Sequence, residues 1–242
     1  MINIIVPLAG PDIYLDNNNI RPLQLVNSKP MILDVLKSRV WIKDEKSVET
    51  INYIFILRKI GKDYEKLKSF LKKNFNNSKF ITLSNLSQGA LFTALCGSSM
   101  IKDFSAPIII DLGDISCNLR FNPSQYFNDN NKVDGLIPYF KSSHPKFSYL
   151  EKTNEIVYNI REKEVISNFA SVGIYIYRNF KFFLNSIIYA IENENICSIN
   201  DTFFVAPSMN SIIKDGKEVH TFEVKNVRPH SLNYHDSDRT CS

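Results

Sequence analysis

The sequence lacks any apolar run long enough to cross a bilayer, so we expect no membrane-spanning helix and no membrane partner. It also lacks a CxxC pair, because its four cysteines are far apart, at Cys96, Cys117, Cys197 and Cys241. That spacing argues against a zinc site or a disulfide framework and favours a reducing, cytoplasmic location. The first residues, MINIIVPLAG, have no basic segment and no clear cleavage site, so they predict a β-strand and not a signal peptide.

A block of like charge is missing as well. The chain has 29 basic and 25 acidic residues, a formal net charge of +4, and its lysines are scattered. This mild excess suits anionic small substrates, but it is not the basic patch of a nucleic-acid-binding protein, so no nucleic-acid partner is expected. No internal repeat, low-complexity segment or clear linker interrupts the sequence. With 44% hydrophobic residues, the chain is predicted to form one domain, 1–242, around a sizeable core.

Short apolar runs alternate with segments of helical periodicity in the first half of the chain. The expected strands are 2–8, 51–57, 80–83 and 107–112, and the expected helices are 30–40, 64–75 and 89–100. This alternation is typical of βαβ units, so we expect a Rossmann-like three-layer α/β/α fold with a mainly parallel central sheet. Ligands of such sheets bind at the carboxyl ends of the strands, where Gly10 and Asp114 are expected.

The second half is richer in strand-like pieces, which predicts a smaller β-rich part attached to the same domain. The expected strands are 133–139, 148–150, 156–160, 172–177 and 219–224, and the expected helices are 180–192 and 203–213.

Two segments near the start carry candidate phosphate-binding groups. IIVPLAG ends in a small-residue turn at Gly10, whose backbone N–H groups can hold a base or phosphates, although many strands end in such a turn without that role. In RPLQLVNSKPMI, Arg21 could neutralise phosphate charge, or it could be a surface arginine beside a proline turn.

Two glycine-containing segments in the middle of the chain suggest a ligand and a metal. Gly89 opens an expected helix and would let the backbone approach a flat ligand, unless it is an ordinary helix start. In IIIDLGD, Asp114 follows a glycine just past a buried strand and is a good place for a Mg²⁺ ligand, or else a turn aspartate. Asp111 is less suited, because it is expected inside the strand.

HPKFSY, residues 144–149, and REKEVISNFASVGIYIY, residues 161–177, combine charges with an apolar strand. His144 could be a base or a turn residue. Glu162 and Lys163 could bind a phosphorylated substrate, or they could be solvated charge at a strand end.

Taken in order, these segments resemble the sugar-phosphate nucleotidyltransferase family. They are most similar to its bacterial branch found with surface-polysaccharide genes, with an altered triphosphate-binding loop. The similarity runs from IIVPLAG to about KDGKEVHTFEV and includes LGD, HPKFSY and EKEVISNFASVGIY. It implies a fold of the GT-A-like nucleotidyltransferase type. The implied reaction joins an NTP to a phosphorylated acceptor, usually a sugar phosphate, and releases pyrophosphate with the help of Mg²⁺.

The resemblance also implies roles for individual residues. Nucleotide contacts fall on Leu8, Ala9, Gly10 and Gly89, and acceptor contacts fall on Glu162, Lys163, Ser171 and Gly173. Asp114 would hold Mg²⁺, and Arg21, Lys163 and Asp114 would be the catalytic residues. Residues of about 1–130 would form the nucleotide-binding half, about 131–230 the acceptor-binding half, and 231–242 a tail. The oligomeric state stays open, a homo-oligomer included.

The sequence departs from the family in its first loop and near its end. The GxGxR loop is replaced by GPDIY, residues 10–14, where Asp12 would repel a triphosphate. The family's lysine before PL is Arg21, and its late acidic metal ligand has no clear counterpart. A catalytically silent relative that binds a nucleotide or phosphorylated metabolite, or supports a partner enzyme, is therefore the alternative function. A glycosyltransferase using Asp236 and Asp238 is a third, lower-ranked one.

Overall fold

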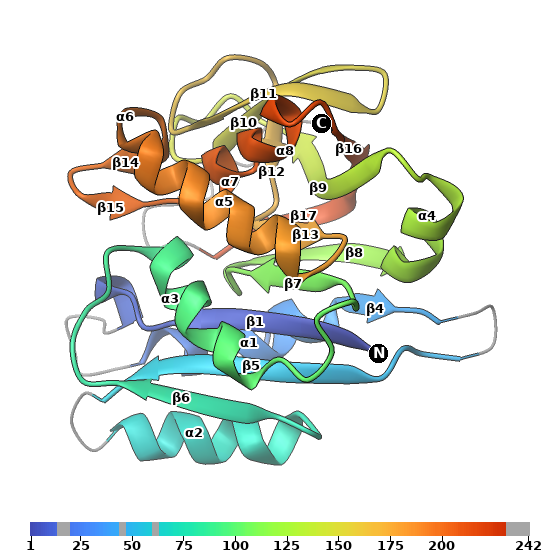
Figure 1. Ribbon diagram of the computed structural model, residues 1–242. Coiled ribbons are helices and arrows are strands. Elements are labelled where there is room, and N and C mark those ends of the chain that lie inside the picture. Colours follow the sequence, from blue (N-terminus) through green and yellow to red (C-terminus); the bar gives the residue numbers. More distant parts are fainter. Residues whose placement is uncertain (14–19, 44–46, 60–62, 231–242) are drawn as a thin grey trace.

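The computed structural model describes residues 1–13, 20–43, 47–59 and 63–230, and its elements are shown in Figure 1. Its largest feature is a ten-stranded sheet of order β12-β10-β11-β16-β9-β13-β7-β1-β5-β6. In that order the strands are Phe169–Ser171, Ser148–Thr153, Ile156–Glu162, Glu218–Glu223, Val133–Lys141, Ile174–Tyr177, Ile108–Asp111, Ile2–Leu8, Ile51–Arg58 and Lys79–Leu83.

The sheet is mixed. Strands β7, β1, β5 and β6 are all parallel, and β9 and β16 form a further parallel pair. However, β13 runs antiparallel to both β7 and β9, and β10, β11 and β12 pair antiparallel with their neighbours. Contrary to the expectation, the large sheet as a whole is therefore not mainly parallel. The β-rich second half, for which no strand direction was predicted, pairs mostly antiparallel, because short connections replace the helical crossovers that parallel pairing needs.

Helices lie against both faces of the sheet, and the apolar strand residues pack on them alternately. In β1, Ile4 and Val6 face a core shared with α1 (Met31–Lys37) and α2 (Asp63–Asn74). Ile5 faces a second core with α3 (Ala90–Gly97) and α5 (Phe180–Glu192). In Figure 1, α3 and α5 cross the front of the sheet. Because both faces are covered, successive residues of β1 are buried, as its apolar run predicted.

The expected helix at 30–40 ends early, at Lys37, and its last residues form β4 (Arg39–Trp41). This strand joins β8 (Ile115–Phe121) and β17 (Lys225–Pro229) in a three-stranded sheet of order β17-β8-β4 that the sequence did not predict. Strand β8 begins directly after Asp114, so the small sheet holds one end of the turn that carries this residue.

The expected helix at 203–213 is divided. Strand β15 (Thr202–Phe203) precedes α7 (Val205–Ser208) and α8 (Asn210–Lys214). The Asn210 side chain accepts a hydrogen bond from Ile160 N at 3.1 Å and donates to Ile160 O at 2.9 Å and Pro207 O at 3.0 Å. These bonds hold the junction between α7 and α8 against β11.

The remaining elements are short and connect the layers. They are α4 (Pro123–Asp129), α6 (Glu194–Cys197), β2 (Leu25–Val26), β3 (Lys29–Pro30), β14 (Ser198–Ile199) and the 3₁₀ turns η1 (Pro11–Ile13), η2 (Arg21–Leu23) and η3 (Ser98–Met100).

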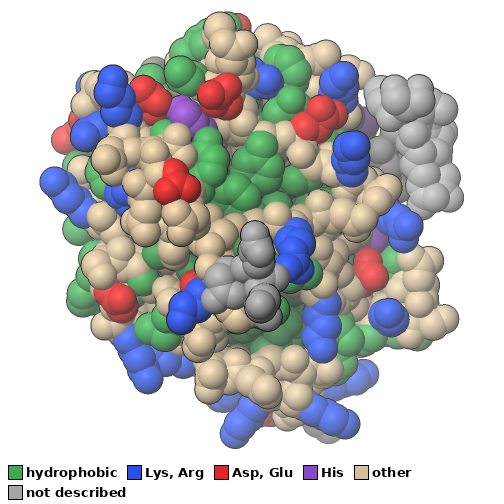
Figure 2. All heavy atoms as spheres, turned by 90° about the vertical axis from the view of Figure 1, so that its right-hand side faces the viewer, with side chains coloured by type: hydrophobic (Ala, Val, Ile, Leu, Met, Phe, Trp, Pro, Cys, Tyr) green, Lys and Arg blue, Asp and Glu red, His purple; other side chains and the backbone are tan. Residues whose placement is uncertain are grey.

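No helix among the described residues is both long and apolar enough to cross a membrane. Cys96, Cys117 and Cys197 are free thiols, whereas Cys241 lies outside the described residues. Figure 2 shows one face of the molecule, on which Lys and Arg side chains spread widely with acidic ones between them.

Candidate active site

A cavity of about 310 Å³ opens at the carboxyl ends of β1 and β7. Residues from both strand ends, from the loop after β1 and from the start of α3 line it. They include Leu8, Gly10, Asp12, Arg21, Ser87, Gly89, Gly113, Asp114 and Thr202. The fold therefore brings together side chains that are more than 100 residues apart, at the edge where parallel sheets bind ligands.

Three of the four predicted nucleotide-contacting residues line this cavity. Leu8, Gly10 and Gly89 are on its wall, whereas Ala9 is buried behind it with 1% of its surface exposed. Gly10 leaves room beside Asp12, because a Cβ on Gly10 would lie 2.7 Å from Asp12 Oδ1.

Gly89 is required by the packing of the chain itself. Its φ is +100°, and a Cβ there would lie 2.3 Å from Phe203 O and 2.7 Å from Phe203 N. The preceding residue accepts a hydrogen bond from Phe203 N at 2.9 Å. Any side chain at position 89 would push β15 away from the start of α3. A glycine is therefore needed here for the second half of the chain to pack against the first.

Asp114 lies in the turn between β7 and β8, on the cavity wall. About a third of its side chain, 32%, is exposed. Its backbone carbonyl accepts a hydrogen bond from His230 N at 2.8 Å, and a Cβ on Gly173 would lie 3.4 Å from its Oδ1. Burial raises the pKa of the Asp114 carboxyl, Arg21 opposes that rise and Asp12 adds to it. The negative charge of this carboxylate is therefore offset only in part by the nearby cation of the protein.

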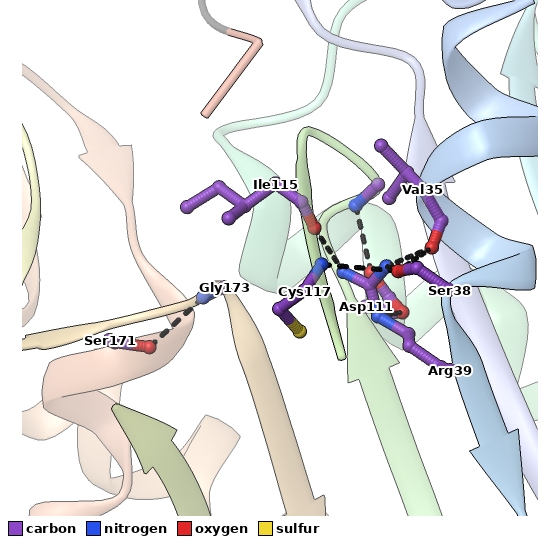
Figure 3. Close-up of polar contacts among 9 residues, drawn as sticks. Val35, Ser38, Arg39, Asp111, Ile115, Cys117, Ser171 and Gly173 are labelled. Carbon is purple, nitrogen blue, oxygen red and sulfur yellow. Dashed lines mark hydrogen bonds and ion pairs between the residues drawn. The ribbon is translucent and has the colours of Figure 1, made fainter. Parts of the chain in front are cut away.

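A buried ion pair supports the turn from behind (Figure 3). Arg39 Nε lies 2.7 Å from Asp111 Oδ2, and both side chains are almost fully buried. Asp111 Oδ1 accepts a hydrogen bond from Gly113 N at 2.9 Å, and Arg39 Nη2 donates to Ile115 O at 2.8 Å. These bonds fix the residues on either side of Asp114. As expected, Asp111 ends the strand and is not available to a ligand.

Arg21 is held between two carboxylates at the cavity wall. Only 8% of its side chain is exposed, and its Nη1 forms an ion pair with the exposed carboxylate of Asp12. Its Nη2 donates to His230 O at 3.2 Å and lies 4.0 Å from Asp114 Oδ2. The surface-arginine interpretation is therefore wrong, but the charge of this cation is already balanced by Asp12.

Two of the four predicted acceptor residues, Glu162 and Ser171, lie in a cluster of polar side chains near Asp114. Ser148 Oγ donates to Glu162 Oε2 and lies 3.4 Å from Tyr175 Oη. Burial raises the pKa of Glu162 to about 7, and Ser148 and Lys163 oppose the rise while Asp114 adds to it. We call Glu162, Ser148, Tyr175 and Ser171 the acceptor-side cluster.

The turn beside this cluster is shaped by Ser171 and Gly173. Ser171 is 2% exposed and accepts a hydrogen bond from Gly173 N at 3.1 Å, as drawn in Figure 3. Gly173 has a φ of +74°, and its carbonyl accepts from Leu112 N at 3.0 Å. This bond joins the acceptor-side cluster to the residue just before Gly113.

Lys163 and His144 lie at the outer edge of this region. Lys163 is exposed, has a φ of +55°, and carries its Nζ 4.8 Å from the centre of the Phe204 ring. His144 Nδ1 accepts from Lys146 N at 3.3 Å and its carbonyl accepts from Tyr149 Oη at 2.8 Å, the contacts of a turn residue.

The arrangement can be tested against a Mg²⁺ ion. No group of three acidic, histidine or cysteine side chains that could hold a metal occurs among the described residues. In proteins, Mg²⁺ is usually bound by one or two carboxylates together with substrate phosphates and water. The partly exposed, incompletely compensated carboxylate of Asp114 fits an ion that is shared with phosphates, and it does not fit a cage of protein groups.

Sequence reasoning missed His230, Arg39 and Ser148, and it treated Asp12 only as a source of repulsion. Asp12 and Ser148 lie within motifs that the sequence analysis used, but their contacts with Arg21 and Glu162 depend on how separate segments fold together. His230 and Arg39 lie in no such motif. Asp236 and Asp238 lie outside the described residues.

Neither a protein-family model nor a curated protein matches this sequence. Solved structures do. The chain is similar to a nucleoside-diphosphate-sugar pyrophosphorylase from Vibrio cholerae RC9, with a TM-score of 0.77 and 16% identity over 94% of this chain and 95% of that one. It is also similar to a putative glucose-1-phosphate thymidylyltransferase from Bacillus anthracis, with a TM-score of 0.67 and 19% identity over 92% and 87%.

A further similar structure is an inositol-1-phosphate CTP transferase from T. maritima, with a TM-score of 0.62 and 9% identity over 94% of this chain and 86% of that one. At these identities the similarity establishes the fold: the chain has the mixed α/β fold of these nucleotidyltransferase structures over nearly its whole length.

Proposed function

We propose that this protein is a nucleotidyltransferase of the pyrophosphorylase type. It joins an NTP to a phosphorylated acceptor, a sugar phosphate, and makes a nucleotide-activated product for bacterial capsule or other surface polysaccharide in the cytoplasm. The observation that carries the proposal is that members of both predicted residue sets lie around Asp114. This residue lines the cavity with Leu8, Gly10 and Gly89, and its carboxylate is also close to Gly173 and near enough to Glu162 and Tyr175 to raise their pKa values.

The similar structures add support through their own ligands. One is a UDP-glucose pyrophosphorylase complexed with UDP-glucose, and another is a UTP-bound UGPase from Acinetobacter baumannii. Both have TM-scores above 0.6 to this chain, at 15% identity.

In the proposed reaction, an oxygen of the acceptor phosphate forms a bond to the α-phosphorus of the NTP. The bond from that phosphorus to the bridging oxygen breaks in line, and pyrophosphate leaves with the electron pair. The cavity backbone orients the nucleotide, and Lys163 holds the acceptor phosphate. Arg21 lies where it can neutralise charge on the transferring phosphates. A bound Mg²⁺ at Asp114 would offset the remaining phosphate charge.

Glu162 suits a neutral or hydrogen-bonding role toward the acceptor. Because its pKa is raised to about 7, a large share of it is protonated at neutral pH. A protonated carboxyl can donate a hydrogen bond to a sugar hydroxyl without repelling the nearby phosphate.

We expect Asp12→Asn to increase the affinity for Mg²⁺·NTP about fivefold, because it frees Arg21 from its ion pair and removes one negative charge from the cavity. Isothermal titration calorimetry with each nucleotide measures the change. The matched control is Asp129→Asn, which removes an exposed carboxylate on α4 that does not line the cavity. Weaker binding of Asp12→Asn would mean that Asp12 helps to hold the metal and does not compete for Arg21.

Lys163→Ala is expected to raise the acceptor KM at least tenfold, since a hydrogen bond to a charged phosphate contributes about 1.5–3 kcal/mol. NTP binding should stay unchanged, because Lys163 does not line the nucleotide cavity. Steady-state kinetics with the acceptor varied test this, with Lys72→Ala on α2 as a charge-matched control. Loss of NTP binding in Lys163→Ala would show that the two subsites are assigned wrongly.

The ion pair between Asp12 and Arg21 favours a second candidate function. Because it neutralises the one cation that lines the described cavity wall, a relative that binds a nucleotide or phosphorylated metabolite without turnover is the alternative.

A pyrophosphate-release assay distinguishes the two functions. Purified protein is incubated with Mg²⁺, each of CTP, UTP, GTP, ATP and dTTP, and a panel of sugar and polyol phosphates, and thermal shifts are recorded in parallel. Release with one substrate pair establishes the enzyme. A thermal shift without release from any pair favours the silent binder.

A further inference from the structure

Helix α5 presents an apolar stripe on its outer side. Its inner side packs Phe183, Ile187 and Ala190 into the core. Beside that inner side, about a quarter turn around the helix, Leu184, Ile188 and Ile191 are 39%, 49% and 57% exposed. Figure 1 shows α5 crossing the front of the molecule, with no other element drawn over it.

The spacing of the three side chains is that of a helix-packing seam. Leu184, Ile188 and Ile191 follow each other at intervals of four and three residues, which places them on one line along the helix. A surface helix normally carries polar residues on that line. Exposed aliphatic side chains that adjoin one another mark a surface that binds another protein.

The charges at the two ends of the stripe are of opposite sign. Lys181 is exposed in the first turn of α5, and Glu192 is exposed at its last residue. Neither forms an ion pair with any residue that the structure describes. A surface with a cation at one end and an anion at the other is complementary to itself when it is turned around.

We propose that this stripe pairs with the same stripe of a second copy of the chain, across a two-fold axis between Leu184 and Ile188. In this antiparallel arrangement, each Leu184 faces Ile188 of the second copy. Each Ile191 faces the aliphatic stem of Lys181, whose ammonium group then lies beside Glu192. The opposed helix dipoles and the two ion pairs fix the antiparallel direction.

The pairing leaves the candidate active site open, because no residue of α5 lines the cavity. One helix per copy buries less surface than a standard interface of about 800 Å² per partner. The dimer should therefore dissociate at micromolar concentrations and not be permanent.

Sedimentation velocity of the full chain from about 1 to 300 µM tests the proposal. We expect the wild type to shift from monomer to dimer over this range. Ile188→Asp should stay monomeric throughout, with the circular dichroism spectrum and melting profile of a folded chain. The control is Tyr158→Asp, which changes an exposed apolar residue of β11 and not of α5. It should dimerise like the wild type.

The charges give an independent test that involves no apolar substitution. Lys181→Glu and Glu192→Lys should each weaken the dimer at least fivefold, and the double exchange should restore it. A wild type that is monomeric at 300 µM overturns the proposal. So does a dimer that survives Ile188→Asp, or a double exchange that is no stronger than its single variants.

Discussion

Replacing Asp114 by asparagine is expected to lower turnover about 100-fold or more while leaving the fold intact. The carboxylate is the group on the cavity wall that fits a metal shared with phosphates, and loss of one such charge from a transition state typically has an effect of this size. Asparagine has nearly the same shape, and it removes a carboxylate whose ionised form is disfavoured by burial. The unfolding free energy should therefore not fall at neutral pH.

Two measurements separate these effects. Pyrophosphate release reports turnover, and binding of Mn²⁺ in the presence of NTP, followed by electron paramagnetic resonance, reports the metal without turnover. The comparison variant is Asp129→Asn, which changes an exposed carboxylate of α4 that does not line the cavity. Full turnover in Asp114→Asn would remove this residue from the site and, with it, the proposed role of the β7–β8 turn.

Breaking the buried ion pair behind that turn is expected to produce the largest loss of stability. Asp111→Asn leaves the Arg39 guanidinium buried without a counter-charge, since both side chains are nearly inaccessible. Removing one partner of such a pair costs about 3–5 kcal/mol. In a chain of 242 residues this lowers the melting temperature by roughly 10 °C. Urea denaturation at fixed pH measures the free energy directly.

The double variant Asp111→Val/Arg39→Met tests how the pair acts. Replacing both charges by apolar side chains of similar size should recover much of the lost stability. It should not recover turnover, because the bonds to Gly113 N and Ile115 O that hold Asp114 in position are still missing. A double variant with normal turnover would mean that the pair supports the fold and has no positioning role. An Asp111→Asn variant as stable as the wild type would contradict the stability prediction itself.

The parts of the fold that were predicted from the sequence are those encoded in local patterns. The apolar runs at β1, β5 and β7 and the periodicity of α2 and α5 depend on neighbouring residues, so their positions were right within one or two residues. The antiparallel pairing of the second half was not predicted, because a strand pattern does not contain the direction of its partner. Strands β4, β8 and β17 were not predicted, because their pairing joins segments as far apart as residues 118 and 225.

The candidate site shows the same difference between local patterns and long-range contacts. Asp114 and Gly10 follow strand ends and were found from that position alone. The contact between Asp12 and Arg21 depends on how one loop folds against another, and the bond from His230 N to Asp114 O joins residues 116 positions apart. Gly89 does open a helix, as expected, but the sequence did not show its packing against a distant strand. Its missing side chain makes room for the backbone of Phe203, whatever ligand it contacts in addition.

The position of β16 has a consequence for how the chain is made. This strand ends at Glu223, yet it lies inside the large sheet, between β11 and β9. While a ribosome is still making residue 217, both of these neighbours have an edge with unpaired backbone groups. Such edges are the usual starting points of aggregation between nascent chains. We therefore expect the second half to complete its folding only after β16 has left the ribosome exit tunnel, and synthesis that stalls before it to yield insoluble fragments.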